Sequence, residues 1–268
     1  MKDNKKFKKY ELTSESIEWS GVTLYRIRAL RDFCNVTAGE LGGFVQSEAN
    51  LSHYGDSWVY DDAKVYERGR ILENANITKS ATVCGCAIVS KKATVEDKAV
   101  ITGRAIIHDN AKVCGNAIVM GKAIIQDFAI VQNDSLIYGN AIVGKYSNLG
   151  GDITVSDNAK ILINSSPLFL SNNAHICGDA RIFSITDIVT INPLGSQGHT
   201  LTACRSENRW GEEIEVSIQG ILYTLKKFKL YISHMSCNNP ETGQYRAAIE
   251  FIKNFFSVNE SSKNHGRT

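Results

Sequence analysis

A glycine-rich stretch, GSQGHT at residues 195–200, has a composition that can turn backbone N–H groups toward an anion. Basic residues follow on neighbouring segments, and together these groups predict a pocket for a small anionic ligand. The residues of this candidate site are Gly195, Ser196, Gly198, His199, Arg205, Lys226 and Lys227. The stretch does not match a nucleotide-binding P-loop, and the alternative is a plain turn between two strands.

His108 is a second candidate, because an imidazole can serve as a general base near neutral pH. It is the only histidine in residues 55–162, so a zinc centre built from three histidines is excluded there. The seven cysteines are scattered without metal-ligand spacing, and we expect free thiols, no bound metal and no cofactor. The alternative for His108 is an ordinary surface histidine.

The segment that carries His108 is built from one repeated unit of six residues. Eighteen consecutive windows run from Gly55 to Leu162, with alanine at the third position in thirteen and valine or isoleucine at the fifth in all but one. Positions three and five of a strand share a face, whereas the Gly, Asp, Asn, Lys and Glu of positions one and two are typical of turns. An unbroken period indicates a solenoid. We expect each window to supply one short strand, three windows to close a coil, and the segment to form six coils.

The fourth position of each window points outward, yet it carries stacked aliphatic residues on two faces of the expected coil. The isoleucine ladder consists of Ile88, Ile106, Ile124 and Ile142, and the mixed ladder consists of Val100, Ile118 and Leu136. Apolar stacks of this length mark contact surfaces more often than free ones, so the ladders predict an oligomer interface. The alternative is that isoleucine occupies strands for its β-branched shape alone.

A solenoid needs a cover at each end, because an open coil exposes apolar core and unpaired strand edges. Residues 1–54 read as an N-terminal β cap, and residues 55–184 as the β-helix. Its register shifts by three residues after Ile161, at a bulged corner or short excursion near Pro167, and a last partial coil follows. Residues 185–258 read as a small α+β domain, with strands up to residue 233 and one helix over residues 240–257. Residues 259–268 are expected to be a disordered tail.

The phrases VYDDAK, VCGNAI and VMGKAI resemble the hexapeptide repeat of left-handed parallel β-helices. This resemblance covers residues 55–162 and implies a mainly β fold with left-handed coils that associate as a homotrimer. The fold includes acyl-CoA-dependent acyltransferases, which use a histidine as general base, and also inert scaffolds. His108 would be that base, but the long loop that shapes the substrate cleft of the acyltransferases is missing from these six coils.

The phrases GGFVQSEANLSHYGDSWVY and INPLGSQGHTLTACR resemble the YdcK-like hexapeptide-repeat proteins of phages and prophages. The segment QYRAAIEFIKNFF extends this resemblance to nearly the whole chain. It implies a non-enzymatic binding or scaffold protein, which would sequester a small anionic, nucleotide-like host signal or block a host defence protein. An acyltransferase and a structural part of a virion are the alternatives.

Composition narrows the range of partners. Thirty basic and 28 acidic side chains give a net charge of +2, which provides no footprint for nucleic acid. The opening MKDNKKFKKY is basic, but no apolar segment follows it as in a secretory signal, and no apolar run approaches the length of a membrane helix. We therefore expect a cytoplasmic protein without a membrane partner.

Overall fold

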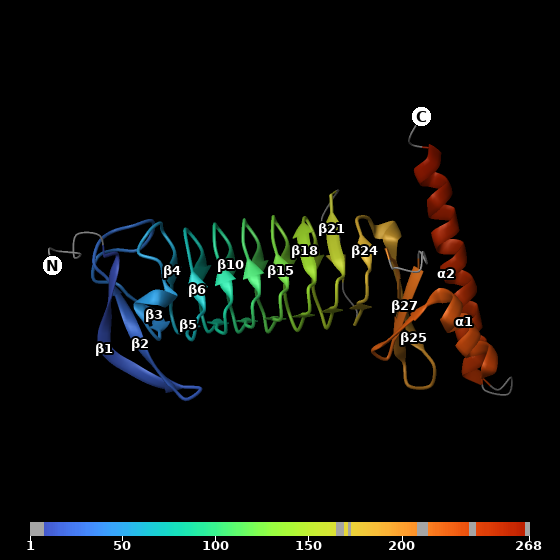
Figure 1. The fold of residues 1–268 in the computed structure, drawn as a ribbon, viewed down its shortest axis with the longest axis horizontal. Coiled ribbons are helices and arrows are strands. Elements are labelled where there is room, and N and C mark those ends of the chain that lie inside the picture. The colour runs from blue at the N-terminus through green and yellow to red at the C-terminus, as the bar shows by residue number, and fades with distance from the viewer. Residues whose placement is uncertain (1–7, 165–168, 171–172, 208–213, 236–239, 266–268) are drawn as a thin grey trace.

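A computed structural model describes residues 8–164, 169–170, 173–207, 214–235 and 240–265. The chain forms a straight, parallel β-solenoid with three sheets, covered at one end by an antiparallel hairpin and at the other by an α+β domain (Figure 1). The predicted fold class is confirmed: the protein is mainly β, and its repeat builds a solenoid of parallel strands.

Strands three windows apart pair in parallel, and they build the three faces of the solenoid. The isoleucine face consists of β6 (Arg70–Ile71), β9 (Ile88–Val89), β12 (Ile106–Ile107), β15 (Ile124–Ile125), β18 (Ile142–Lys145), β21 (Lys160–Ile163) and β24 (Arg181–Ile182). The mixed face consists of β5 (Lys64–Val65), β8 (Thr82–Val83), β11 (Val100–Ile101), β14 (Ile118–Val119), β17 (Leu136–Ile137), β20 (Thr154–Val155) and β23 (His175–Ile176). The third face consists of β4 (Trp58–Val59), β7 (Asn76–Ile77), β10 (Thr94–Val95), β13 (Lys112–Val113), β16 (Ile130–Val131), β19 (Asn148–Leu149) and β22 (Phe169–Leu170).

The inward and outward positions of the repeat lie where the sequence predicts them. Ala117 and Val119 are completely buried, whereas Ile118 between them is half-buried on the outside of the coil. One apolar core runs from the N-terminal cap through all the coils, and small and branched side chains alternate along it. Because side chains alternate along a strand, a register slip of one residue would bring the whole inner set to the surface.

Each corner begins with a residue in the left-handed region of the backbone. All eighteen first positions of the windows, from Gly55 to Asp157, have a positive φ. Glycine is required at some of them for a second reason, since a Cβ atom on Gly85 would lie 2.7 Å from the backbone nitrogen of Gly103 in the next coil. The turn residues of the repeat therefore determine where each strand ends.

The seventh coil is longer than the others. Strand partners lie three windows apart up to the pair Lys145–Ile163, but Asn148 pairs with Phe169 and Thr154 with His175, in each case three positions further along the chain. The predicted shift of three residues is thus present, and the solenoid continues past it. Pro167, the expected position of the bulged corner, lies outside the described residues.

The N-terminal cap extends the mixed face with three further strands, β1 (Tyr10–Trp19), β2 (Val22–Ala29) and β3 (Leu41–Val45), followed by a 3-10 helix, η2 (Glu48–Asn50). β1 and β2 form an antiparallel hairpin, and β3 pairs in parallel with β5. The phase of the repeat places Trp58 outward, yet it is completely buried because Tyr10 and Phe33 pack edge-on against its ring. The cap therefore covers the first strand of the third face.

Lys9 is a fully buried cation in this cap. Its Nζ donates hydrogen bonds to the carbonyl oxygens of Ser57 at 2.6 Å and Gly55 at 3.3 Å, and lies 5.1 Å from the ring centre of Phe33. Burial lowers the pKa of Lys9 to about 8. The side chain ties the start of the hairpin to the first corner of the solenoid.

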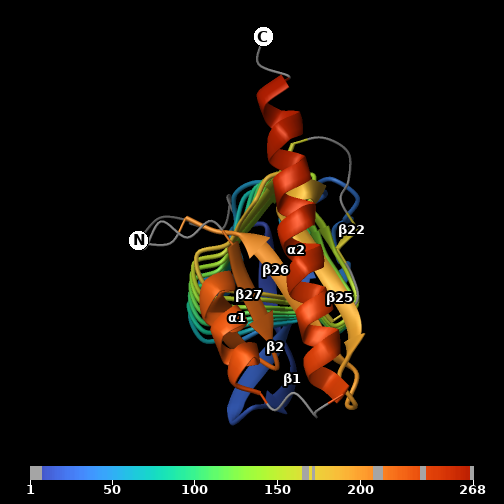
Figure 2. The ribbon, with the colours of Figure 1, turned by 90° about the vertical axis from the view of Figure 1, so that its right-hand side faces the viewer.

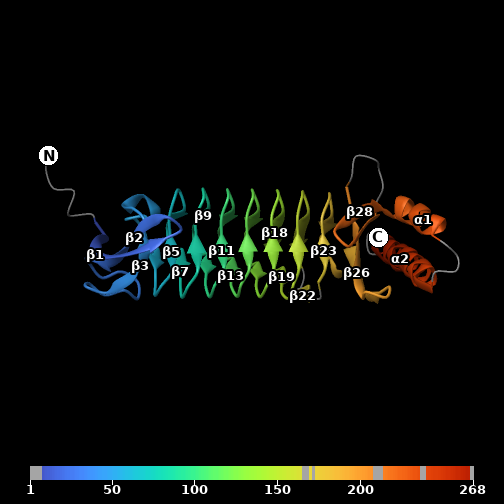
Figure 3. The ribbon, with the colours of Figure 1, turned by 90° about the horizontal axis from the view of Figure 1, so that it is seen from below.

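The C-terminal domain follows a second 3-10 helix, η3 (Ile185–Asp187), and begins with an antiparallel sheet of β25 (Ile188–Leu194), β26 (His199–Arg205), β27 (Ile214–Ile218) and β28 (Ile221–Thr224). One face of this sheet covers the last coil, where the hydroxyl of Thr202 accepts a hydrogen bond from the backbone N–H of His175. The other face carries α1 (Leu225–His234) and α2 (Pro240–His265), which lie beyond the end of the solenoid (Figures 2 and 3).

Two expectations for this domain are wrong. The sequence predicts strand over residues 225–233, but they form α1, because the Thr224 hydroxyl caps the helix by accepting from the N–H of Lys227, and Phe228 and Ile232 bury one helical face. The final helix also continues to His265, into the expected disordered tail. Its polar last turns contain no glycine or proline to stop the helix before Gly266.

Candidate functional site

His108 is held by a carboxylate beside the isoleucine ladder. Its Nδ1 lies 2.7 Å from Oδ2 of Asp109, and the side chain is 23 % exposed. Lys91 contacts Oδ1 of the same carboxylate at 2.5 Å, and this bond holds the pKa of Asp109 below its usual range. A carboxylate at Nδ1 favours an imidazole whose Nε2 can accept a proton, which is the arrangement of a general base.

The described coils carry no projecting loop near His108. Residues 55–163 are all described, and they form strands and tight corners without a projecting loop. The neighbours of His108 in the coils before and after it are Ser90 and Gln126. An acyl-transfer site also needs walls that exclude water, and the loop that would form such walls is missing from these described coils.

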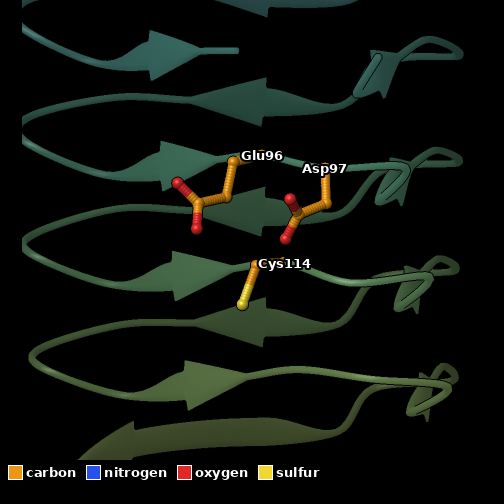
Figure 4. A group of neighbouring side chains, drawn as sticks. All are labelled: Glu96, Asp97 and Cys114. Atoms are coloured by element: carbon orange, nitrogen blue, oxygen red, sulfur yellow. The ribbon is translucent and has the colours of Figure 1, made fainter. Parts of the chain in front are cut away.

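Sequence reasoning missed a group of possible metal ligands on the third face. Glu96 and Asp97 lie side by side at the end of β10, and Cys114 lies one coil further along (Figure 4). One ligand atom from each lies within 4.8 Å of the others. The signal in the sequence was the sixth and first positions of consecutive windows, which stack in space on their equivalents three windows later.

The charges of this group are already balanced by lysines. Oε1 of Glu96 lies 2.6 Å from Nζ of Lys112, and Oδ1 of Asp97 lies 2.6 Å from Nζ of Lys79. The bond from Lys79 is the main reason that the pKa of Asp97 is lowered, whereas burial raises the pKa of the Cys114 thiol and keeps it protonated. Two paired carboxylates and a neutral thiol stabilise adjacent coils, and they make a poor cation site.

The N–H groups of the glycine-rich loop are hydrogen-bonded to side chains of α2, one of which is a carboxylate. The N–H of Ser196 donates to Oε1 of Glu241 at 2.7 Å, and the N–H of Gly195 donates to Oε1 of Gln244 at 2.9 Å. Glu241 and Gln244 lie on the first turns of α2. The bonds from Ser196 lower the pKa of Glu241, so the carboxylate is ionised at neutral pH. This contact depends on the turn of the loop, in which Gly195 has a φ of +71°, a left-handed backbone conformation that favours glycine.

The basic residues of the predicted ligand site do not converge on this loop. Arg205 lies at the opposite end of β26 from His199, where its Nε is 3.4 Å from Oδ1 of the buried Asp187 and its guanidinium donates to the carbonyl of Phe256. Lys226 and Lys227 are on the first turn of α1, at its outer surface. Arg205 thus attaches α2 to the sheet, and the two lysines face solvent.

A cavity of about 310 Å³ does lie beside the loop, between the turn of β27 and β28 and the two helices. We call it the C-terminal cavity. Ser196 and His199 line it from the predicted ligand set, and Glu241 lines it from α2. Three tyrosines from β28, α1 and α2 form much of the remaining wall: Tyr223, Tyr231 and Tyr245. Their convergence was not visible in the sequence, because they come from elements whose packing depends on the misread helix α1.

The structure brings the predicted interface residues into two continuous stacks. Ile106 is the direct strand partner of both Ile88 and Ile124, and Ile124 pairs in turn with Ile142. On the mixed face, Ile118 pairs with Val100 and with Leu136. All seven side chains are half-buried by their stacking neighbours and keep an outward surface.

An exposed aromatic pair extends this apolar surface beyond what the sequence predicted. Phe128 and Tyr146 stack at the corner after the isoleucine face, with ring centres 5.4 Å apart and planes inclined by 9°. They are 53 % and 49 % exposed. In the sequence, the two aromatic residues follow Ile124 and Ile142 at the same distance of four positions.

Comparison with known protein families finds no match, and a comparison with curated proteins also finds none. In the described part of the chain, neither helix has the length and apolarity needed to cross a membrane. The candidate sites are therefore defined by their own geometry and chemistry.

Proposed function

We propose that the protein is a non-enzymatic binding scaffold, which self-associates through its solenoid and presents its C-terminal domain to a ligand or partner. The observation that carries the proposal is the pair of in-register ladders on two neighbouring faces. Four aliphatic side chains are stacked on one sheet and three on the next, and such surfaces gain free energy from being covered.

The two ladders differ in composition and lie on different faces, which favours a contact between unlike surfaces. The isoleucine face of one copy would meet the mixed face of the next, and a contact of this kind closes into a ring when the rotation permits. A homotrimer about an axis parallel to the solenoid is the assembly that the hexapeptide-repeat resemblance implies. The exposed pair Phe128 and Tyr146 would lie at the edge of the buried region.

The biological setting of this scaffold follows from its resemblance to YdcK-like proteins of phages and prophages. A protein of that type would act in the cytoplasm on a host target, either by sequestering a small host signal or by blocking a defence protein. The chemistry of the glycine-rich loop bears on that choice. Because Glu241 and Gln244 already accept the N–H groups of Ser196 and Gly195, a nucleotide-like anion would have to displace these side chains to bind there.

The oligomeric state provides the direct test. Sedimentation equilibrium at micromolar concentration should give the mass of a trimer for the wild type, and of a monomer for the double variant Ile106→Glu and Ile124→Glu. Buried charges without partners oppose association, which is the reason for the expected dissociation. Thr94→Glu places a single carboxylate at the matching position of the third face and should remain trimeric. A monomeric wild type would refute the proposal.

An acyl-CoA-dependent acyltransferase is the second candidate, and the contact between His108 and Asp109 is the observation that favours it. Acetyl-CoA hydrolysis and transfer to small amines and alcohols should be absent from the wild type, and His108→Ala should leave biological activity intact. Turnover by the wild type that is lost in His108→Ala would replace the scaffold with the enzyme. Incorporation into purified phage particles would instead indicate a virion part.

A further inference from the structure

Among its described lining residues, the C-terminal cavity carries a negative charge and no permanent positive one. Glu241 is the only acidic side chain of that lining, and no lysine or arginine contributes to it. His199 is the other titratable side chain apart from the tyrosines, and both of its ring nitrogens face the amide nitrogen of Gln219, at 2.6 and 3.1 Å. An ionised carboxylate on the wall of a cavity attracts cations.

Glu241 is held in a fixed position by the loop. Its Oε1 accepts the N–H of Ser196, and a carboxylate can accept several bonds on its two oxygens. The arrangement reverses the usual role of a glycine-rich loop, because the loop holds a negative side chain of the protein that is itself part of the cavity wall. An anionic ligand would have to displace this carboxylate or lie against it, and both are unfavourable.

Aromatic rings make up the rest of the recognition surface. Tyr223 and Tyr231 stack with their ring centres 5.6 Å apart, and Tyr231 is 51 % exposed. Phe228 lies behind them, 5.6 Å from Tyr223, and Tyr245 meets Phe228 edge-on at 6.2 Å. The faces of aromatic rings attract cations by their quadrupole, and alkylated ammonium groups benefit most because they cost less to remove from water than metal ions.

We propose that the C-terminal cavity binds a small organic cation, with its alkylated ammonium group between the Glu241 carboxylate and the rings of Tyr223 and Tyr231. A volume of about 310 Å³ accommodates a small organic molecule and is far larger than a single ion requires. The inference deepens the proposed binding function and rests on it, since it assigns the ligand class of the presented domain.

Choline and its neutral carbon isostere, 3,3-dimethylbutan-1-ol, provide a matched pair of probes. Isothermal titration calorimetry with the full-length protein should show choline binding at least about tenfold more tightly than the isostere, a ratio that corresponds to about 1.4 kcal/mol. Inorganic phosphate should neither bind in the cavity nor compete with choline. Equal affinity for choline and the isostere, no detectable choline binding, or competition by phosphate would each overturn the proposal.

Three variants test the geometry of the site. Glu241→Gln keeps an oxygen acceptor for the N–H of Ser196 while it removes the charge, and it should weaken choline binding about tenfold. Tyr231→Leu keeps an apolar side chain but removes the ring, and it should weaken choline more than the isostere. Glu250→Gln removes an exposed carboxylate elsewhere on α2 and should have no effect. Choline affinity unchanged by Glu241→Gln, in a variant whose thermal midpoint is unchanged, would refute the assignment.

The failure of the ligand class and the failure of the scaffold proposal can be distinguished by combining calorimetry with sedimentation. If choline binds as expected but the wild type sediments as a monomer, the scaffold proposal fails and the ligand class stands. If the protein is trimeric and choline does not bind, the ligand class fails and the scaffold stands.

Discussion

Raising the pH from 8 to 10 should stabilise the N-terminal cap, because Lys9 is buried there. Burial lowers the pKa of Lys9 to about 8, and the positive charge of Arg31 acts in the same direction, whereas Asp56 opposes it. In the unfolded chain the pKa returns to its ordinary value of 10.5. Between these two values the unfolded state binds the proton and the folded state does not, so the free energy of unfolding rises with pH.

The size of the effect follows from the shift. Each pKa unit corresponds to about 1.4 kcal/mol, and the interval from pH 8 to pH 10 should therefore add about 2 kcal/mol to the stability of the cap. Tyr10 sets the upper limit, because burial raises the pKa of its hydroxyl above the ordinary value of 10.0. Above about pH 10 the unfolded state loses the tyrosine proton first, and stability falls again.

Urea unfolding followed by the fluorescence of Trp58 would measure the stability of the cap at each pH. Trp19 and Trp210 would be replaced by phenylalanine so that Trp58 is the only tryptophan. Trp58 is completely buried under the cap, so its emission reports whether the cap is seated. Lys9→Met should remove the rise between pH 8 and pH 10, and Lys8→Met, a change at the neighbouring half-buried lysine, should keep it. A flat wild-type profile, or the same rise in Lys9→Met, would show that Lys9 stays protonated in the folded state.

Three further predictions concern the register, the cap and the end domain. Val113→Asp should destabilise the solenoid by several kcal/mol in thermal unfolding, because it places an unpaired carboxylate in the core, whereas Lys112→Gln on the outside of the same strand should cost far less. Gly43→Ala should lower the thermal midpoint, since the new Cβ would lie 2.5 Å from the carbonyl of Ala63, and Gly243→Ala should not, since that position is open. Arg205→Gln should speed hydrogen exchange in α2 by weakening its attachment, whereas replacement of Lys226 and Lys227 should not; equal exchange in all variants would contradict this role.

The solenoid could be predicted in detail because its determinants are local and repeated. The choice of Ala117 and Val119 as inward residues needed only the alternating period of a strand, and the same choice recurred in every window. The pairing of Ile106 with Ile124 followed from the coil length alone. A wrong assignment of inward and outward residues in one window would conflict with the pattern of the other seventeen windows.

The end domain could not be predicted in the same way, because its structure depends on contacts between distant residues. Residues 225–233 carry apolar groups that fit both a strand and a helix, and the burial of Phe228 and Ile232 against α2 decides in favour of the helix. The composition of the loop at Ser196 predicts an anion site, but in the folded chain the carboxylate of Glu241, a residue far along the sequence, accepts the N–H of Ser196. The repeat places Trp58 outward, but the cap that buries it lies in another segment.

The constant coil length has a consequence for how the distance between the two ends can change. Because strand partners lie three windows apart, removal of three consecutive windows from the middle coils would leave each remaining strand with a partner of the same phase. The cap and the α+β domain would then approach each other by about 4.8 Å, the spacing of neighbouring strands. The seventh coil adds that three extra residues between Ile163 and Phe169 leave the parallel pairing of the following strands in place. Insertions within a coil can therefore change the cross-section of the solenoid, whereas only duplication or loss of a whole coil changes the distance between the two end domains.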